Sequence, residues 1–143
     1  MTDFVLDASV AAKWFRAAKD EPYSQQALAL YEGYLRREFN FIVPDIFWAE
    51  IGSIFWKAIR QGRLEKTPAE EAIADLMKCE LSSFASATLL VKAFDIATTF
   101  DRSVYDSLYV SLALQSNTQF ITADERLANA LASRFPVRWL GTI

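Results

Sequence analysis

Histidine is absent from this sequence of 143 residues, and cysteine occurs once, as Cys79. The missing histidine excludes Ser-His-Asp hydrolases, histidine general acid-base catalysis, phosphohistidine relays and histidine-ligated metals. A single cysteine excludes an intramolecular disulfide and a cysteine-rich zinc site. Any chemistry must therefore depend on carboxylates, hydroxyls, amines or a bound ion.

The sequence also lacks long apolar runs, internal repeats and linkers. No segment approaches the roughly 18 to 20 apolar residues of a membrane span, and the N-terminal MTDFVLDASV lacks the basic and apolar regions of a signal peptide. We therefore expect a cytoplasmic protein without a membrane segment. With 52% hydrophobic and 23% charged residues, residues 1–143 are predicted to form one folded domain. The net charge of -3 argues against a protein that coats nucleic acid, although a local basic patch can still attract a polyanion.

Short apolar strands alternate with helices along the chain. Strands are predicted at residues 4–6, 41–43, 81–84, 118–122 and 137–140. Helices are predicted at residues 10–15, 22 to about 39–40, 45–61, 67–79, 86–99, 103–115 and 124–135. This alternation indicates an α/β fold of the doubly wound kind, with a parallel sheet covered on both faces. Ligands of such sheets bind beyond the carboxyl ends of the strands, near the point where the strand order reverses.

Two acids follow two of the predicted strands directly. Asp7 ends the segment FVLD and Asp124 follows FITA. A parallel sheet places both residues at the same edge. Each Asp also precedes a predicted helix, where Asp is a favoured N-cap worth about 1 kcal/mol relative to Ala. Helix capping alone is therefore an alternative role for either residue.

Two further acids fall on the apolar faces of predicted helices. Glu50 has Ile46 and Ile54 four residues to either side, and Asp106 has Tyr109 three residues later. Burying an unpaired carboxylate costs several kcal/mol or raises its pKa, so acids in such positions require a compensating cation. A salt bridge to an inward basic side chain would supply one. Four basic residues are candidates for such bridges: Lys13, Lys57, Arg102 and Arg126.

Salt bridges are a less favoured explanation for all four acids together. Four carboxylates that gather in one pocket would repel each other. Carboxylates around a void, without histidine, are typical of a site for a hard divalent ion such as Mg2+ or Mn2+. Such an ion supports phosphodiester hydrolysis by activating water and neutralising phosphoryl charge. Ser9 and Thr122 stand beside the two strand-end acids and are expected to hold them by hydrogen bonds, or else to act as ordinary helix caps.

The four acidic segments resemble the motifs of PIN-domain ribonucleases, in particular the toxins of the VapBC toxin-antitoxin type. They read LDASVAAKW, PDIFWAEIGSIFWKA, VYDSLYVSLALQ and FITADERLA, and the resemblance extends from Phe4 to about Leu140. It implies a three-layer α/β/α fold with a parallel sheet of about five strands. It also implies a Mg2+- or Mn2+-dependent endoribonuclease, a VapB-like antitoxin and a homodimer. By position, the family's metal-coordinating acids match Asp7, Glu50, Asp106 and Asp124, and Thr122 matches the hydroxyl residue before the last acid.

An RNA substrate requires positive charge beside such an acidic pocket. The candidates for this role are Lys57, Arg60 and Arg63, or Lys13 and Arg16. Cations on a helix surface usually serve only solubility, which is the alternative for each. The helix at 45–61 carries four aromatic residues, Phe47, Trp48, Phe55 and Trp56. Its wide apolar face indicates an antitoxin groove, a dimer interface or plain core packing.

Three other functions are alternatives to the nuclease. A phospho-acceptor receiver domain would carry a paired acidic motif early in the chain and an essential Lys after a late strand, and neither is evident. A haloacid-dehalogenase-like phosphatase would need an Asp where Ser9 stands. A catalytically silent member that keeps the fold for binding only is the third alternative, against which the intact acids argue.

Overall fold

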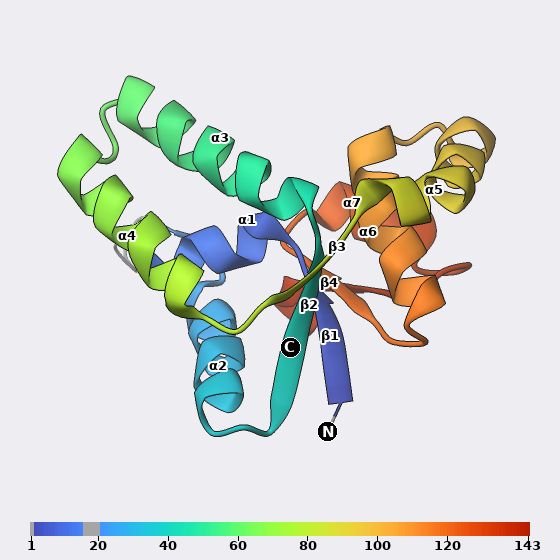
Figure 1. The fold of residues 1–143 in the computed structure, drawn as a ribbon, viewed down its shortest axis with the longest axis horizontal. Coiled ribbons are helices and arrows are strands. Elements are labelled where there is room, and N and C mark those ends of the chain that lie inside the picture. Colours follow the sequence, from blue (N-terminus) through green and yellow to red (C-terminus); the bar gives the residue numbers. More distant parts are fainter. Residues whose placement is uncertain (1, 16–20) are drawn as a thin grey trace.

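The computed structural model describes residues 2–15 and 21–143, and it is built around one parallel sheet (Figure 1). The strands are β1 (Thr2–Leu6), β2 (Phe39–Pro44), β3 (Ser82–Phe84), β4 (Phe120–Thr122) and β5 (Val137–Trp139). All neighbouring pairs are parallel, in the order β3-β2-β1-β4-β5. The expected α/β fold with a five-stranded parallel sheet is confirmed.

Helices cover both faces of this sheet. They are α1 (Ala8–Ala11), α2 (Ser24–Leu35), α3 (Ile46–Arg60), α4 (Lys66–Lys78), α5 (Ser86–Phe100), α6 (Val104–Gln115) and α7 (Glu125–Leu131), with short 3-10 turns at Ala12–Phe15 and Leu140–Thr142. Helices α1 to α4 lie on one side, and α5, α6 and α7 lie on the other (Figure 1). No helix in the described ranges is long and apolar enough to cross a membrane.

Successive strand residues enter two separate cores, which explains the three layers. Val5, Ile42 and Phe120 pack with α5, α6 and α7, whereas the residue after each of them packs with α1 to α4. Side chains alternate between the faces of a strand, so a strand that is apolar at every position must be covered on both faces. The continuous apolar runs in the sequence therefore determine this architecture.

The strand order places one crevice at the carboxyl edge of the sheet. From β1, the chain adds β2 and β3 on one side and later returns to add β4 and β5 on the other. The two halves diverge beside β1 and β4, where the connections leave in opposite directions and open a crevice for a ligand. Asp7 follows β1, and Asp124 lies two residues beyond β4.

Helix α2 differs from the sequence prediction at both ends. It begins at Ser24, after Tyr23 in a left-handed conformation, and it ends at Leu35 rather than near residues 39–40. Arg37 has a φ of 60°, which breaks the helical path, and Phe39 then pairs with the first residue of β1. The helix ends early because pairing with the central strand replaces its last predicted turn.

Helix α7 also ends earlier than predicted, at Leu131 instead of Phe135. The amides of Arg134 and Phe135 both donate to the Leu131 carbonyl, at 3.0 and 2.8 Å, in a final turn outside the helix. Pro136 follows and cannot continue a helix, and it restricts the residue before it to extended conformations. The chain therefore leaves the helix several residues before the proline and enters β5.

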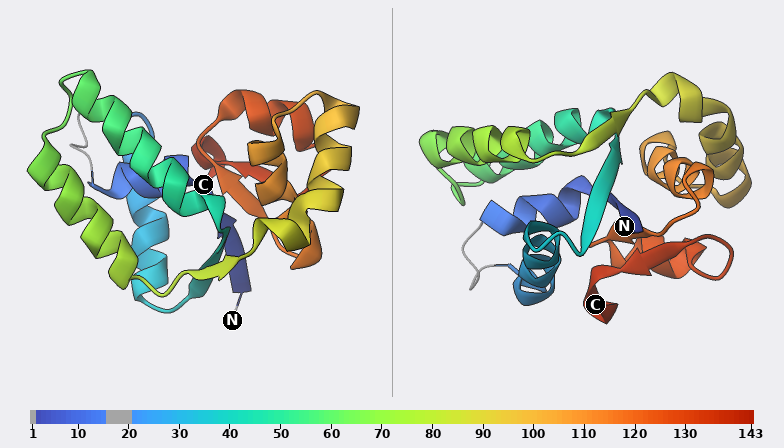
Figure 2. Two further views of the ribbon diagram at one scale, coloured as in Figure 1. Left: turned by 45° about the horizontal axis from the view of Figure 1, so that its top comes forward. Right: turned by 60° about the horizontal axis from the view of Figure 1, so that its bottom comes forward.

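Helices α3 and α4 form a hairpin that extends away from the sheet (Figure 2). The turn between them contains Gly62 with a φ of 70°, a conformation that glycine adopts without strain. The amide of Arg63 donates to the Ala58 carbonyl at 2.9 Å and closes the end of α3. The predicted stop of this helix at Gly62 is confirmed.

Candidate active site

The two strand-end acids are held by one threonine. The Thr122 hydroxyl donates to Oδ2 of Asp7 at 2.7 Å and accepts the backbone amide of Asp124 at 3.0 Å. Thr122 is fully buried as the last residue of β4, next to β1 in the sheet. Its side chain therefore fixes the spacing between the ends of the two strands.

Both strand-end acids are also N-caps. Asp7 accepts the amide of Ser9 at 3.3 Å, and Asp124 accepts the amide of Leu127 at 3.1 Å. The capping role that sequence reasoning left open is therefore present in both. Capping engages one oxygen of Asp124, whereas both oxygens of Asp7 already accept a hydrogen bond.

The two helical acids approach the same place from α3 and from the start of α6. Glu50 is half-buried, and its Oε1 accepts the Tyr109 hydroxyl at 2.6 Å. Asp106 is half-buried in the first turn of α6, where its amide donates to the Ser103 hydroxyl at 3.0 Å. The apolar face of α3 thus directs Glu50 toward the protein interior, as its spacing predicted.

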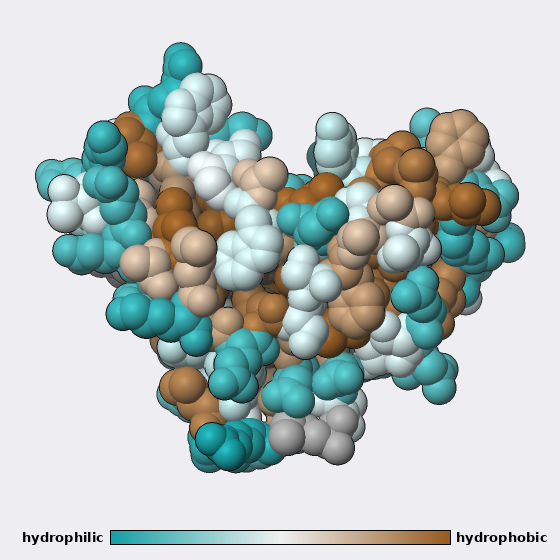
Figure 3. All heavy atoms as spheres, viewed as in Figure 1, coloured by the Kyte–Doolittle hydropathy of each residue, from teal (hydrophilic) through white to brown (hydrophobic). Residues whose placement is uncertain are grey.

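All four predicted acids line a single cavity of about 240 Å³. Its lining residues are Asp7, Ala8, Ser9, Glu50, Ser53, Ile54, Lys57, Asp106 and Asp124. On the surface, a notch separates the α3–α4 hairpin from the lobe of α5, α6 and α7 (Figure 3). Within residues 2–15 and 21–143, no three acid or thiol side chains already form a compact set of metal ligands. The acids thus line the same cavity, but no three of them lie close enough together to form a set of metal ligands in this structure.

The charges of the four acids influence each other. Burial raises the pKa of Asp7 from 3.8 to about 7, the Thr122 hydrogen bond opposes this rise, and the charges of Glu50 and Asp106 add to it. Burial also raises the pKa of Glu50, which the Tyr109 hydrogen bond partly offsets. These carboxyls therefore retain protons more readily than free acids do.

The pKa of Asp106 is raised as well, first by burial and further by the charge of Asp124. A hydrogen bond from Ser103 and the charge of Arg102 oppose the rise. Arg102, one of the proposed salt-bridge candidates, thus acts electrostatically on Asp106. No Lys or Arg in the described ranges forms a salt bridge with any of the four acids.

The predicted RNA-contacting cations are not equivalent. Lys57 is exposed and lines the cavity, seven residues after Glu50 on α3. Arg60 lies over the Trp56 ring, 4.9 Å from its centroid. Both remain available at the surface of α3.

Lys13 and Arg63 both form ion pairs with Glu21. Lys13 is buried with its ammonium 3.0 Å from Oε2 of Glu21, and Arg63 lies 3.1 Å from Oε1 of the same carboxylate. The expectation that Lys13 contacts RNA is therefore corrected, because its charge is enclosed and neutralised. Arg16 lies outside the described residues.

The aromatic side chains of α3 divide between core and surface. Phe47 and Phe55 are fully buried, and Trp48 packs against the same core. Trp56 alone among the four is largely exposed, at 54%. Core packing therefore accounts for three of the four aromatic side chains of this helix. Only the Trp56 side chain, among these four, lies at the surface.

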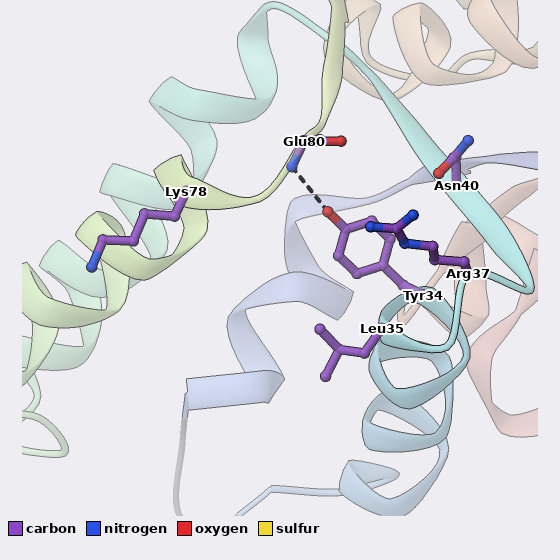
Figure 4. A pocket seen from close by; sticks show the side chains of 6 residues that line it. All are labelled: Tyr34, Leu35, Arg37, Asn40, Lys78 and Glu80. Carbon is purple, nitrogen blue, oxygen red and sulfur yellow. Dashed lines mark hydrogen bonds between the residues drawn. The ribbon is translucent and has the colours of Figure 1, made fainter.

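A larger cavity lies elsewhere, between the C-terminal ends of α2 and α4 (Figure 4). It measures about 470 Å³, and the Tyr34 hydroxyl accepts the Glu80 amide at 2.9 Å across it. Its lining carries Arg37 and Lys78 together with Glu80. One acid lies there beside two cations, and none of the four predicted acids belongs to this cavity.

Sequence reasoning missed three side chains of the site. The sequence pattern indicates Tyr109 only as an apolar neighbour of Asp106, whereas its hydroxyl donates to Glu50. Ser53 lines the cavity one turn after Glu50, and Ser103 bonds Asp106. The available signals were the spacing of Ser53 and a Ser-x-x-Asp capping pattern at the start of α6.

Comparison with known proteins identifies the family. The model of the PIN domain family matches residues 4–131, most of the chain. This chain belongs to the PIN-domain family. Ribonuclease VapC3 of Pyrobaculum aerophilum is 30% identical to it over 126 residues, 87% of this chain and 91% of that protein.

Solved structures share the fold of this PIN domain. The VapBC2 structure from Rickettsia felis, bound to a fragment of promoter DNA, superimposes with a TM-score of 0.64 at 14% identity, covering 96% of this chain and 98% of the other. Mycobacterium tuberculosis VapC20, described as a toxin that cleaves the sarcin-ricin loop, gives a TM-score of 0.65 at 15% identity, covering 92% and 95%. At these identities the likeness concerns the fold of the PIN domain.

Proposed function

We propose that this chain is a Mg2+- or Mn2+-dependent endoribonuclease and the toxin of a toxin-antitoxin pair. The observation that carries the proposal is the cavity that Asp7, Glu50, Asp106 and Asp124 line together, coming from four distant segments. Membership of the PIN-domain family and the VapC ribonuclease relative support it. A phosphodiester backbone is the substrate class that such a site suits.

The donor set is suited to a hard divalent cation. The cavity offers carboxylate and hydroxyl oxygens and contains neither histidine nor cysteine, which matches the ligands that Mg2+ and Mn2+ prefer. Asp7, Glu50, Asp106 and Asp124 would hold such an ion. When bound, it would supply an activated water and neutralise charge on the phosphoryl oxygens.

The surrounding residues prepare the acids for this role. Thr122 holds Oδ2 of Asp7 and the backbone at Asp124, so the two strand ends keep a fixed separation. Because the pKa of Asp7 is raised to about 7, a cation at this carboxyl competes with a proton near neutral pH. Lys57 lines the acidic cavity and would contact an RNA phosphate there.

Partners are expected at two exposed apolar surfaces. We place the antitoxin against Trp56 of α3, the aromatic residue of that helix left outside the core. We place the dimer interface on α5, where Leu90, Val91 and Phe94 are 46%, 87% and 59% exposed. Hydrophobic spheres gather over this helix in Figure 3. Such a stripe on a monomer is typical of an interaction surface.

A second copy is the occupant that the charges beside the stripe favour. Lys92 and Asp95 border the exposed residues of α5 and form an ion pair at 3.9 Å within one copy. Two antiparallel copies of α5 related by a two-fold axis would also bring each lysine toward the aspartate of the other copy, which would make the surface complementary to itself.

The decisive experiment is cleavage of a structured RNA by the purified protein. We expect cleavage with Mg2+ or Mn2+, none with EDTA, and a loss of at least about 100-fold in Asp7→Asn and Asp106→Asn proteins that remain folded by circular dichroism. Asp101→Asn is the matched control, because this exposed acid after α5 lies outside the cavity. Full activity in either site variant would refute the assignment, and no cleavage by any folded preparation would favour the silent binding module.

A further inference from the structure

Tyr109 connects two of the four acidic segments through its hydroxyl. It lies on α6 three residues after Asp106, and its hydroxyl donates to Oε1 of Glu50 on α3 at 2.6 Å. The side chain thus crosses from the helical layer of α6 to the helix that carries Glu50.

The location of Tyr109 leaves its hydroxyl little freedom. The residue is 1% exposed, and its ring stacks on Phe120 of β4 with centroids 5.0 Å apart and planes 15° apart. Stacking fixes the ring, so the position of the hydroxyl oxygen beside Glu50 is fixed as well. Burial and the charges of Asp7 and Glu50 raise the pKa of Tyr109, which keeps it a protonated donor.

Packing alone does not require this hydroxyl. A phenylalanine would stack on Phe120 equally well, and it would not place a polar group that needs partners inside the protein. Glu50, in contrast, has several rotatable bonds and forms no salt bridge with a described residue. A fixed donor at one carboxylate oxygen restricts its side chain and leaves the second oxygen for another partner.

We infer that Tyr109 is a positioning residue: its hydroxyl holds Glu50 in the acidic cavity and thereby arranges that carboxylate for a divalent cation. The inference rests on the proposed function, since it concerns the same cavity. It adds a residue that does not line the cavity and acts only through Glu50. Hydrogen-bond partners of metal ligands commonly affect metal affinity by about 10- to 100-fold.

The test is Mn2+ binding by the purified protein, followed by electron paramagnetic resonance and independent of RNA cleavage. Tyr109→Phe is expected to bind Mn2+ about tenfold or more weakly than the wild type. Glu50→Gln is expected to bind weakly too, and the double variant no more weakly than Glu50→Gln alone, because Tyr109 acts through Glu50. Tyr109→p-aminophenylalanine, which restores a donor, is expected to recover affinity.

Tyr34→Phe is the matched control. It likewise removes a tyrosine hydroxyl with one hydrogen bond, that from the Glu80 amide, but on a half-buried residue at the distant cavity of Figure 4. We expect its Mn2+ affinity to equal that of the wild type. Binding is measured well below the melting temperature of every variant, so that a loss of stability alone does not lower the affinity.

The outcomes separate the two proposals. Wild-type affinity in Tyr109→Phe, or a further loss in the double variant, would overturn the role of Tyr109 and leave the nuclease proposal intact. Failure of p-aminophenylalanine to recover any affinity would also contradict it. Absence of Mn2+ binding in the wild type would instead remove the cation from the proposed function, and the positioning role with it.

Discussion

Replacement of Asp7 by asparagine should stabilise the metal-free protein while abolishing its activity. The carboxyl is 9% exposed, and its pKa is raised to about 7 because burial and the charges of Glu50 and Asp106 oppose ionisation. Asparagine has nearly the same shape but a single oxygen, so it can accept either the Ser9 amide, as an N-cap does, or the Thr122 hydroxyl, and not both. The variant therefore removes the buried charge at the cost of one hydrogen bond.

The size of the effect follows from the difference between the folded and unfolded pKa of Asp7. The pKa rises from the ordinary value of 3.8 to about 7. At about 1.4 kcal/mol per pH unit, the ionised Asp7 therefore lowers the free energy of unfolding by at most about 4 kcal/mol. In this interval the unfolded chain has released its proton while the folded protein retains it, so wild-type stability falls as the pH rises. Above about pH 7 both states are ionised and the penalty is constant.

The assay is thermal or urea unfolding of wild type and Asp7→Asn at several pH values in EDTA. We expect the variant to be more stable by roughly 1 to 3 kcal/mol at pH 8, because the lost hydrogen bond offsets about 1 kcal/mol of the gain, and by clearly less at pH 5. Equal stability at pH 8, or an advantage that does not grow between pH 5 and 7, would refute the account of this carboxyl.

Asp45→Asn provides a control of opposite sign. Asp45 is an exposed acid whose pKa is lowered by hydrogen bonds from the hydroxyl and the amide of Ser86. Its ionised form therefore adds stability above the ordinary pKa, and this contribution disappears at lower pH. The variant should be less stable than the wild type at pH 8, and the difference should shrink in acid.

Two further predictions concern packing and assembly. Glu21→Ala leaves the buried Lys13 without its carboxylate partner at 3.0 Å and should lower the free energy of unfolding by about 3 kcal/mol or more, whereas Glu38→Ala on the surface should change it by less than about 1 kcal/mol. Similar urea midpoints for these two variants would contradict the assignment. Val91→Glu should halve the mass measured by light scattering if α5 forms the dimer interface, and a wild-type monomer would exclude that interface.

Local patterns in the sequence were sufficient for the sheet and for the positions of the acids. Apolar runs buried on both faces specify parallel strands, so residues directly after β1 and β4 had to lie at one edge. Helical spacing likewise placed Glu50 on the inner face of α3. These inferences succeed because side-chain periodicity depends only on neighbouring residues.

The end of helix α2 and the burial of Lys13 were not determined in this way. The last predicted turn of α2 became a strand because Phe39 pairs with Thr2, 37 positions earlier in the numbering. Lys13 has the composition of a surface cation, yet it is buried because Glu21 lies beside it. Competition between local preference and distant contacts decided both cases.

The sequence by itself determined which chemistry is available to this protein: oxygen ligands, no imidazole, and four acids in the order of the PIN-domain motifs. Only the tertiary structure decided that these acids share one cavity, that none forms a salt bridge with a described basic residue, and that the Tyr109 hydroxyl donates to Glu50. The physical reason is that these interactions join residues far apart in the sequence. Charge repulsion, burial and a hydrogen bond between residues 59 positions apart depend on how the helices pack over the sheet, which no local pattern encodes.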